Sequence, residues 1–262
     1  MSDLSKMERL DKILANAKIG SRKEVRLLIK AGRIRVDDEI ATDHGARYDR
    51  EQNKFYLDGA LVDTREFIYL ILNKPEGYLS ATEDAYGPVV IDLLQLKHQA
   101  FNPFPVGRLD KDTKGLLLLT NDGVLNHKLI SPRWHINKVY RAKLRDPAEE
   151  NYHKKLLKGI VLDDDYRCLP ALMEVLSEDG TEVELTIQEG KFHQVKRMFE
   201  ALGNKVLDLT RIGFGPLDLP KDLALGEYRE LRDEELELLR QAVKKKAEPL
   251  KIDEEENKLN TN

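Results

Sequence analysis

One polar loop holds the residues best suited to chemistry. Residues 107–113 read Gly-Arg-Leu-Asp-Lys-Asp-Thr and lead into the run 116–119, which is Leu-Leu-Leu-Leu. An uninterrupted apolar run of this length predicts a strand that is buried on both faces. Asp110, beside Arg108 and fixed against that strand, would be held ionised and in one position. Taken alone, an aspartate in a polar loop more often caps a turn than catalyses a reaction.

Composition predicts a globular protein with an ample core. The chain has 262 residues, of which 41% are hydrophobic and 34% charged, enough for one large domain or two smaller ones. No apolar run reaches membrane-spanning length, and the charged first nine residues lack the apolar core of a secretion signal. The single cysteine, Cys168, excludes an internal disulfide, and the histidines show no ligand spacing. We therefore expect a cytoplasmic protein without a metal site.

Positive charge is concentrated near the N-terminus, although the net charge is −4. Between residues 9 and 35 only Asp11 and Glu24 are acidic, whereas residues 253–256 are all acidic. A group of one sign suits phosphate contacts, which give affinity but little sequence information. The alternative is an ordinary solvated face, although such a face usually interleaves acids with bases. The bases of this block are Arg9, Lys12, Lys18, Arg22, Lys23, Arg26, Lys30, Arg33 and Arg35.

Local patterns predict two helices and a strand in the same block. Residues 9–17 have apolar side chains at helical spacing, and Ser21-x-x-Glu24 is a capping box that begins a second helix ending at Gly32. Residues 33–36 alternate as a strand does. On the second helix, bases recur every four residues and share one side, at Arg22, Arg26 and Lys30.

Strand patterns in the rest of the chain come in clusters without strict alternation with helices. This arrangement favours an α+β fold with a mostly antiparallel or mixed sheet, flanked by helices, over a doubly wound parallel sheet. We expect a small N-terminal domain at residues 1–66, of which 1–6 are disordered, and a larger domain at 67–246. Residues 247–262 are expected to be a flexible acidic tail.

Four segments resemble a known family. The loop at 107–116 resembles the signature Gly-Arg-Leu-Asp-x-x-Thr-x-Gly-Leu of the pseudouridine synthases that act on ribosomal RNA, with every fixed position present. Ser131-Pro132-Arg133 with Lys138-Val139-Tyr140, and the decapeptide 189–198, resemble two further catalytic segments of that family. Asn-Lys-Pro-x-Gly, at 73–77, resembles the element that opens its catalytic domain. Residues 7–64 resemble the S-four RNA-binding domain, through Arg9-Leu10-Asp11-Lys12-Ile13-Leu14, Ser21-Arg22 and Ala31-Gly32-Arg33-Ile34-Arg35-Val36-Asp37.

The resemblance implies isomerisation of uridine to its C-glycoside without any cofactor. Asp110 would be the essential carboxylate, and either a nucleophilic or a basic role is open. Lys196 would be its cationic partner, with Arg197 as the less favoured candidate. Tyr140 would pack against the target base, which must be flipped out of any helix. Lys196 departs from the arginine that many relatives carry, which replaces a guanidinium fork with a point charge.

The same resemblance implies contacts with RNA. The wording His-Gln-Val-Lys-Arg-Met and Ser-Pro-Arg-x-His is most similar to the enzymes of small-subunit ribosomal RNA, so the expected partner is that RNA or an assembling small subunit, bound by a monomer. A large-subunit enzyme is the alternative. Trp134 could stack on a base or belong to the core. Candidate RNA contacts are Arg108, Arg133, His135, Lys138, Gln194 and Arg197 in the larger domain, and Arg9, Lys12, Arg22, Lys23, Arg26, Lys30, Arg33 and Arg35 in the smaller one.

Two functions from other classes compete with this one. A non-catalytic RNA-binding or ribosome-assembly factor could keep the fold, but we expect such a protein to lose Asp110, Tyr140 and the basic partner. A glycoside hydrolase could use Asp110 and Asp112. In an extended chain residues two apart point to opposite faces, which argues against a facing pair of carboxylates.

Overall fold

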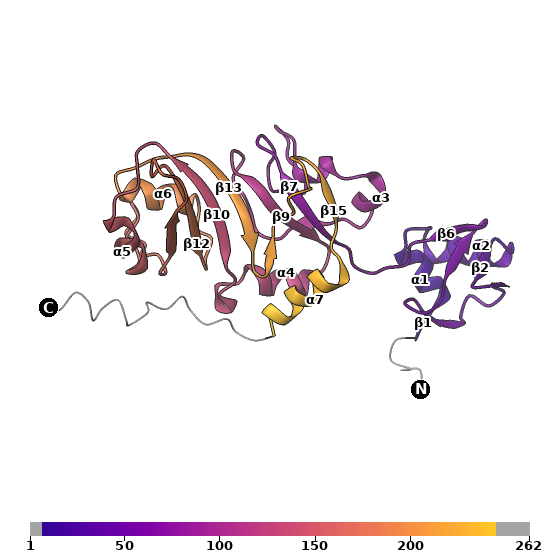
Figure 1. Cartoon of the computed structure of the whole chain (residues 1–262). Coiled ribbons are helices and arrows are strands. Elements are labelled where there is room, and N and C mark those ends of the chain that lie inside the picture. The colour runs from indigo at the N-terminus through magenta and orange to yellow at the C-terminus, as the bar shows by residue number, and fades with distance from the viewer. Residues whose placement is uncertain (1–6, 245–262) are drawn as a thin grey trace. The chain divides into compact units, whose positions relative to one another are not determined.

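The computed structural model describes residues 7–244, which divide into two compact units, one ending at Ile68 and the other beginning at Tyr69 (Figure 1). The expected disordered start and acidic tail lie outside the described residues. No helix in the described part is long and apolar enough to span a membrane.

The first unit packs two helices against a four-stranded sheet. Leu10, Ile13 and Val25 on the helices share one buried core with Ile34 and Phe55 on the strands. The predicted capping box is confirmed, because each of Ser21 and Glu24 accepts a hydrogen bond from the other's backbone N–H. The sheet order is β3-β2-β5-β6, and β1 pairs with β4. The elements are β1 (Met7–Arg9), α1 (Leu10–Asn16), α2 (Arg22–Lys30), β2 (Ile34–Val36), β3 (Glu39–Ile40), β4 (Arg47–Asp49), β5 (Phe55–Leu57) and β6 (Ala60–Val62).

The second unit is built on a nine-stranded mixed sheet of order β11-β12-β10-β13-β9-β7-β15, with β14 paired to β13 and β8 to β9. The pair β9–β13 is parallel and the other strand pairs are antiparallel. The expected α+β fold with a mixed sheet and flanking helices is therefore confirmed. The strands are β7 (Tyr69–Lys74), β8 (Phe104–Pro105), β9 (Lys114–Thr120), β10 (Lys138–Leu144), β11 (Leu172–Val175), β12 (Glu182–Ile187), β13 (Val206–Phe214), β14 (Leu217–Asp218) and β15 (Tyr228–Glu230).

Helices cover this sheet in two groups (Figure 1). In the figure, α4 and α7 lie below the middle strands, and α5 and α6 lie near β12 at one end of the sheet. Short 3-10 helices occupy Val90–Leu93 and Pro132–Trp134. The α-helices are α3 (Leu96–Gln99), α4 (Gly123–Ile130), α5 (Asn151–Leu157), α6 (Gln194–Ala201) and α7 (Asp233–Ala242).

Strand β9 lies at the centre of the core. Its four leucines are at most 3% exposed, which confirms the strand predicted to be buried on both faces. Leu116 and Leu118 belong to one cluster with Leu129 of α4 and Leu239 of α7. The polar loop that precedes β9 is thus attached to the most deeply buried strand of the unit.

Strand register brings three distant segments together on neighbouring interior strands of this sheet. Tyr140 on β10 lies opposite Arg211 on β13, and Arg211 lies opposite Gly115 on β9. The β10–β13 register shifts between Val139 and Tyr140, a bulge of the kind that re-aims side chains. Gly115 has a φ of +102°, and a Cβ there would lie 2.2 Å from the Arg211 carbonyl oxygen. Only glycine lets the two backbones approach so closely.

Candidate active site

The loop before β9 forms a turn that presents Asp110 to a pocket. The Thr113 backbone N–H donates to the Asp110 carbonyl oxygen at 3.1 Å, so the chain bends here. The Ser80 hydroxyl donates to the Leu109 carbonyl at 2.8 Å and accepts from the Leu109 N–H at 3.0 Å. Asp110 itself is partly exposed. Its backbone is therefore fixed from both sides while its carboxylate stays accessible.

Lys74, the last residue of β7, is fully buried and binds the backbone of the same loop. Its ammonium donates to the carbonyl oxygens of Thr113 at 2.9 Å, of Asp110 and Pro75 at 3.0 Å each, and of Lys111 at 3.3 Å. Burial lowers the pKa of Lys74 to about 8, although Asp112 and Asp110 oppose that shift. We did not predict this role from the sequence, although a lysine that ends an apolar strand is a signal for it.

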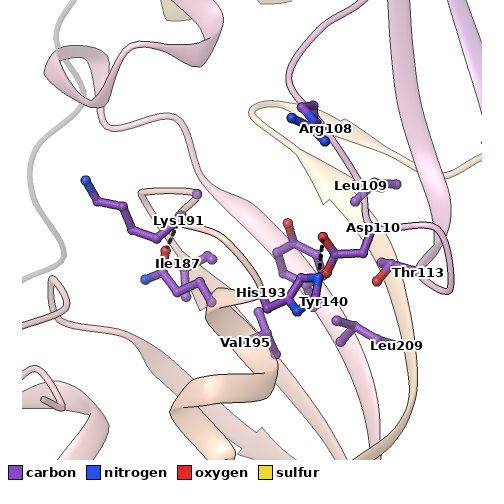
Figure 2. Close-up of a pocket in the computed structure, with 12 residues that line it drawn as sticks. Arg108, Leu109, Asp110, Thr113, Tyr140, Ile187, Lys191, His193, Val195 and Leu209 are labelled. Atoms are coloured by element: carbon purple, nitrogen blue, oxygen red, sulfur yellow. Dashed lines mark hydrogen bonds and ion pairs between the residues drawn. The ribbon is translucent and has the colours of Figure 1, made fainter. Parts of the chain in front are cut away.

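Tyr140 and Asp110 line one pocket (Figure 2). Tyr140 is 7% exposed and reaches the pocket from β10, while Thr113 comes from the loop and His193 from the start of α6. Figure 2 shows the side chains of Asp110, Tyr140 and His193 converging. Val195 and Leu209 add apolar surface to the lining. The site combines a carboxylate, an aromatic ring and an apolar wall.

Two bases approach the Asp110 carboxylate. The Lys196 ammonium lies 3.7 Å from Oδ2, and His193 Nε2 lies 3.6 Å from Oδ1. Arg197 points elsewhere, because its guanidinium pairs with Asp163 at 2.6 Å and with Asp164 at 2.7 Å. The lysine favoured from the sequence is thus the one beside Asp110, and His193 is a neighbour that the motif contained but that we had not singled out.

Asp112 does not point away from Asp110. Lys196 Nζ lies 2.6 Å from Asp112 Oδ1, so the two carboxylates share one ammonium. This hydrogen bond lowers the pKa of Asp112. The expectation that Asp110 and Asp112 face opposite sides, as they would in an extended chain, is wrong, because the loop turns at residues 110–113.

Gln194, predicted to contact RNA, is buried at the start of α6. Its carbonyl oxygen accepts from the Lys191 N–H at 2.8 Å, and its amide donates to Glu189 at 2.6 Å. Glu189 also accepts from the Tyr166 hydroxyl at 2.6 Å, which raises the pKa of Tyr166 to about 12. The oxygen and the nitrogen of the Gln194 side-chain amide therefore both hold the loop that carries His193.

The remaining RNA-contact candidates of the second unit occupy different environments. Arg108 and Arg133 are exposed, and His135 has a left-handed backbone with φ of +48°. Lys138 is only 9% exposed and lines a second pocket. Trp134 is half-buried and packs against the core cluster around Leu116.

In the first unit, Asp11 collects three of the predicted RNA-contacting arginines. It is fully buried and accepts from Arg22 at 2.8 Å, Arg26 at 2.9 Å and Arg9 at 3.2 Å. Burial alone would raise the pKa of Asp11, but the hydrogen bonds from Arg22, Arg9 and Arg26 outweigh burial and lower it strongly. The basic side of α2 is therefore partly neutralised from α1.

Other bases of this unit are paired as well. Lys12 pairs with Glu8 at 2.7 Å, and Arg33 pairs with Asp58. Arg35 stacks on the Tyr56 ring at 3.9 Å and lies 3.5 Å from Asp38. Lys23 and Lys30 form no ion pair with any described residue, and both are exposed. These two lysines of α2 are available for phosphate.

No group of three or more His, Cys, Asp or Glu side chains within residues 7–244 is arranged to hold a metal ion. The site brings a carboxylate together with a histidine, a lysine, a tyrosine and an apolar wall. These groups suit acid–base or nucleophilic chemistry on an organic substrate.

Family models match both units of the chain. A model described as RNA pseudouridylate synthase matches residues 68–201, and the S4 domain matches residues 8–53. A crystal structure of a pseudouridylate synthase superimposes with a TM-score of 0.63 at 37% identity, covering 88% of this chain and 99% of that one.

Relatives of similar length match nearly end to end. The uncharacterized RNA pseudouridine synthase YtzG of Bacillus subtilis is 48% identical over 88% of this chain and 98% of that protein. Ribosomal small subunit pseudouridine synthase A of Vibrio cholerae is 42% identical, over 87% of this chain and 97% of its own length. Ribosomal large subunit pseudouridine synthase B of Bacillus subtilis is 38% identical, over 89% and 96%. The chain therefore belongs to the RNA pseudouridine synthase family, with an N-terminal S4 domain.

Proposed function

We propose that this enzyme converts uridine to pseudouridine in small-subunit ribosomal RNA, with Asp110 as the essential carboxylate. The observation that carries the proposal is the placement of Asp110 in a pocket with Tyr140, with the ammonium of Lys196 at 3.7 Å. A carboxylate that must act on C1′ needs a nearby cation and a partly enclosed setting. Lys196 supplies the cation, and the pocket supplies the enclosure.

The reaction is an isomerisation in which atoms balance without a cofactor. The N1–C1′ bond of uridine breaks, the uracil rotates, and a C5–C1′ bond forms. The C5 proton then leaves to solvent, and N1 gains a proton. Asp110 either bonds covalently to the ribose or removes a proton from it. Tyr140 packs against the uracil, and Lys196 stabilises the carboxylate.

Access to the target requires the nucleotide to leave its stack. Asp110 lies within a pocket, so a paired uridine cannot reach it unless the base is flipped out. The apolar wall of Val195 and Leu209 would receive the base. A single chain carries both the S4 domain and this site, and we expect it to act as a monomer in the cytoplasm.

Small-subunit RNA is favoured over large-subunit RNA by two observations. The relatives named for the small subunit are 38% to 42% identical, against 38% for the large-subunit enzyme of Bacillus subtilis. The wording His-Gln-Val-Lys-Arg-Met at 193–198 and Ser-Pro-Arg-x-His at 131–135 also resembles the small-subunit enzymes. The difference in identity is small, so large-subunit RNA is the second candidate.

Tritium release from C5 tests the proposal directly. Small-subunit and large-subunit ribosomal RNA, each transcribed with uridine tritiated at C5, are incubated with the protein, both free and as partly assembled particles. We expect release from the small-subunit RNA at one equivalent per site. Release from large-subunit RNA alone would reassign the substrate, and no release from any of these RNAs would favour the non-catalytic binder.

A further inference from the structure

A second pocket opens beside the first. Both pockets are lined by Arg108, Tyr140, Gly190 and Lys191, but Asp110 lines only the first. The second pocket adds several side chains of which two are buried cations, Lys138 and Arg211. Tyr140 thus borders a carboxylate pocket and a cationic pocket at once.

Arg211 is the most deeply buried of these cations, at 1% exposure. Its Nε donates to the Leu116 carbonyl oxygen at 2.8 Å, and its guanidinium carbon lies 5.0 Å from the Phe214 ring centre. Its Nη2 is buried and has no hydrogen-bond partner among the described residues. A buried guanidinium donor without an acceptor is costly, which points to a ligand that supplies one.

Lys138 adds a second buried cation. Its ammonium donates to the Ile136 carbonyl at 3.2 Å, and it forms no ion pair with any residue in the described ranges. Burial and the charge of Arg211 lower the pKa of Lys138 to about 8, whereas Glu189 opposes that shift. The ammonium therefore lacks a compensating anion at contact distance.

Glu189 is the acidic residue of this pocket lining, and its carboxylate is engaged elsewhere. One oxygen accepts from Tyr166, and the other accepts from Gln194 and from the Leu169 backbone N–H. Four bases against one carboxylate leave the lining positive. At the rim, Arg108 and Lys191 are exposed, so an anion can enter from solvent.

We propose that this cationic pocket, formed by Arg211, Lys138, Arg108 and Lys191, binds a backbone phosphate of the RNA adjacent to the flipped uridine. This inference rests on the proposed function, because the anion is taken to be a phosphate of the RNA substrate. Guanidinium and ammonium donors suit phosphate oxygens. Since Tyr140 lines both pockets, a nucleotide with its base beside Asp110 can place a neighbouring phosphate here. The pocket is then a positioning device for the flipped nucleotide.

Binding of inorganic phosphate tests the pocket without any turnover. The Arg211 Nε–H, hydrogen-bonded to Leu116, gives a side-chain resonance that can be followed by NMR. Phosphate should shift it in a saturable manner, and Lys138→Met should weaken the apparent affinity by about tenfold. Lys143→Met on the same strand is the matched control, because Lys143 is half-exposed and lies outside the pocket. A resonance that phosphate leaves in place, or shifts equally in both variants, would overturn the proposal.

Neutral linkages locate the phosphate in the RNA. Single methylphosphonates replace each linkage around the target uridine, one at a time. One of them should raise KM about tenfold for the wild type with little change in kcat. The same linkage should cause almost no further increase in KM in Lys138→Met. Penalties that add at every linkage would refute the site. Arg108→Gln, at the exposed rim, repeats the test if Lys138→Met does not fold. If the wild type releases no tritium, the proposed function fails, while the phosphate titration still decides the pocket.

Discussion

Lys196 stands between two carboxylates and is closer to the one that we do not assign to catalysis. Its ammonium is 2.6 Å from Asp112 and 3.7 Å from Asp110. Through this shared ammonium, one lysine contacts both Asp112 of the loop and the carboxylate that we propose as catalytic. It also separates Lys196 from its neighbour Arg197, which is committed to Asp163 and Asp164.

Replacing each base in turn should give opposite results. Lys196→Met should lower kcat by about 100-fold or more, because the Asp110 carboxylate loses the cation that keeps it ionised and in position. Arg197→Met should leave kcat within about threefold, since its partners lie outside the pocket. Single-turnover tritium release measures both. Equal losses in the two variants would show that the residue next to Asp110 is not its functional partner.

The buried Lys74 predicts that both the stability of the protein and the order of the Asp110 loop change with pH. Burial lowers its pKa from 10.5 to about 8, so between these values the unfolded chain holds the proton more tightly than the folded protein. Rising pH in this window therefore increases the free energy of unfolding through this group. Over the same window the folded protein exchanges an ammonium with three donors for an amine with two, which loosens the Asp110 loop.

We therefore expect kcat to fall above about pH 8 without loss of the fold. Saturating RNA, single-turnover kinetics and circular dichroism across this range provide the measurement. Lys138, whose pKa is also about 8, is controlled by Lys138→Met, which should keep the same decline in kcat. A flat kcat profile, or a decline that vanishes in Lys138→Met, would contradict the role of Lys74.

At the scale of elements, the site depends on one parallel contact between β9 and β13. Thr210 lies opposite Lys114 and Arg211 opposite Gly115, which joins strands far apart in the sequence. This contact places the end of the Asp110 loop beside the strand that pairs with Tyr140. The φ of +102° and the 2.2 Å approach at Gly115 make this position intolerant of a side chain.

Gly115→Ala should destabilise the protein by more than about 3 kcal/mol, because the Cβ meets backbone that cannot move aside. Gly226→Ala is the matched control, with a φ of +84° but open space around the Cβ, and should lose only about 1 kcal/mol. Urea unfolding of both variants measures the difference. Similar losses would mean that the strand contact is looser than described.

Local patterns predicted the two N-terminal helices, the strand at 33–36 and the apolar strand β9, and long-range pairing explains what they missed. The capping box at Ser21 and the buried strand at β9 follow from short-range signals. The pairing of β9 with β13, more than 90 residues away, does not follow from them. An alternating pattern predicts a strand but does not say which other strand it pairs with. The turn at Asp112 was hidden for a similar reason, since its shape depends on the buried Lys74.

At the scale of the whole molecule, charge is arranged differently from its order along the chain. The acid Asp11 is one residue among many bases in the sequence, yet it becomes the centre of three ion pairs. Neutralising Arg22 or Arg26 would therefore remove a partner of a buried carboxylate and destabilise the S4 domain as well as weaken RNA binding. Lys23 and Lys30 form no ion pair with Asp11, so replacing them should not destabilise the domain in this way.

A double variant, Lys23→Gln with Lys30→Gln, should weaken RNA binding and reduce the slope of log affinity against log salt by about 1 to 2. Its melting temperature should stay near that of the wild type. Binding titrations over a salt series measure the slope. A slope that does not change would count against phosphate contacts by this helix. The comparison variant, Arg22→Gln with Arg26→Gln, should unfold at a lower temperature than the lysine variant.

The most direct test of the whole account compares Asp110→Asn with Asp112→Asn in tritium release from C5-labelled small-subunit RNA. We expect Asp110→Asn to lower the rate by at least about 1,000-fold with RNA affinity nearly intact, and Asp112→Asn to keep most of the activity. Turnover retained in Asp110→Asn, or abolished in Asp112→Asn, would contradict the assignment of Asp110 as the essential carboxylate.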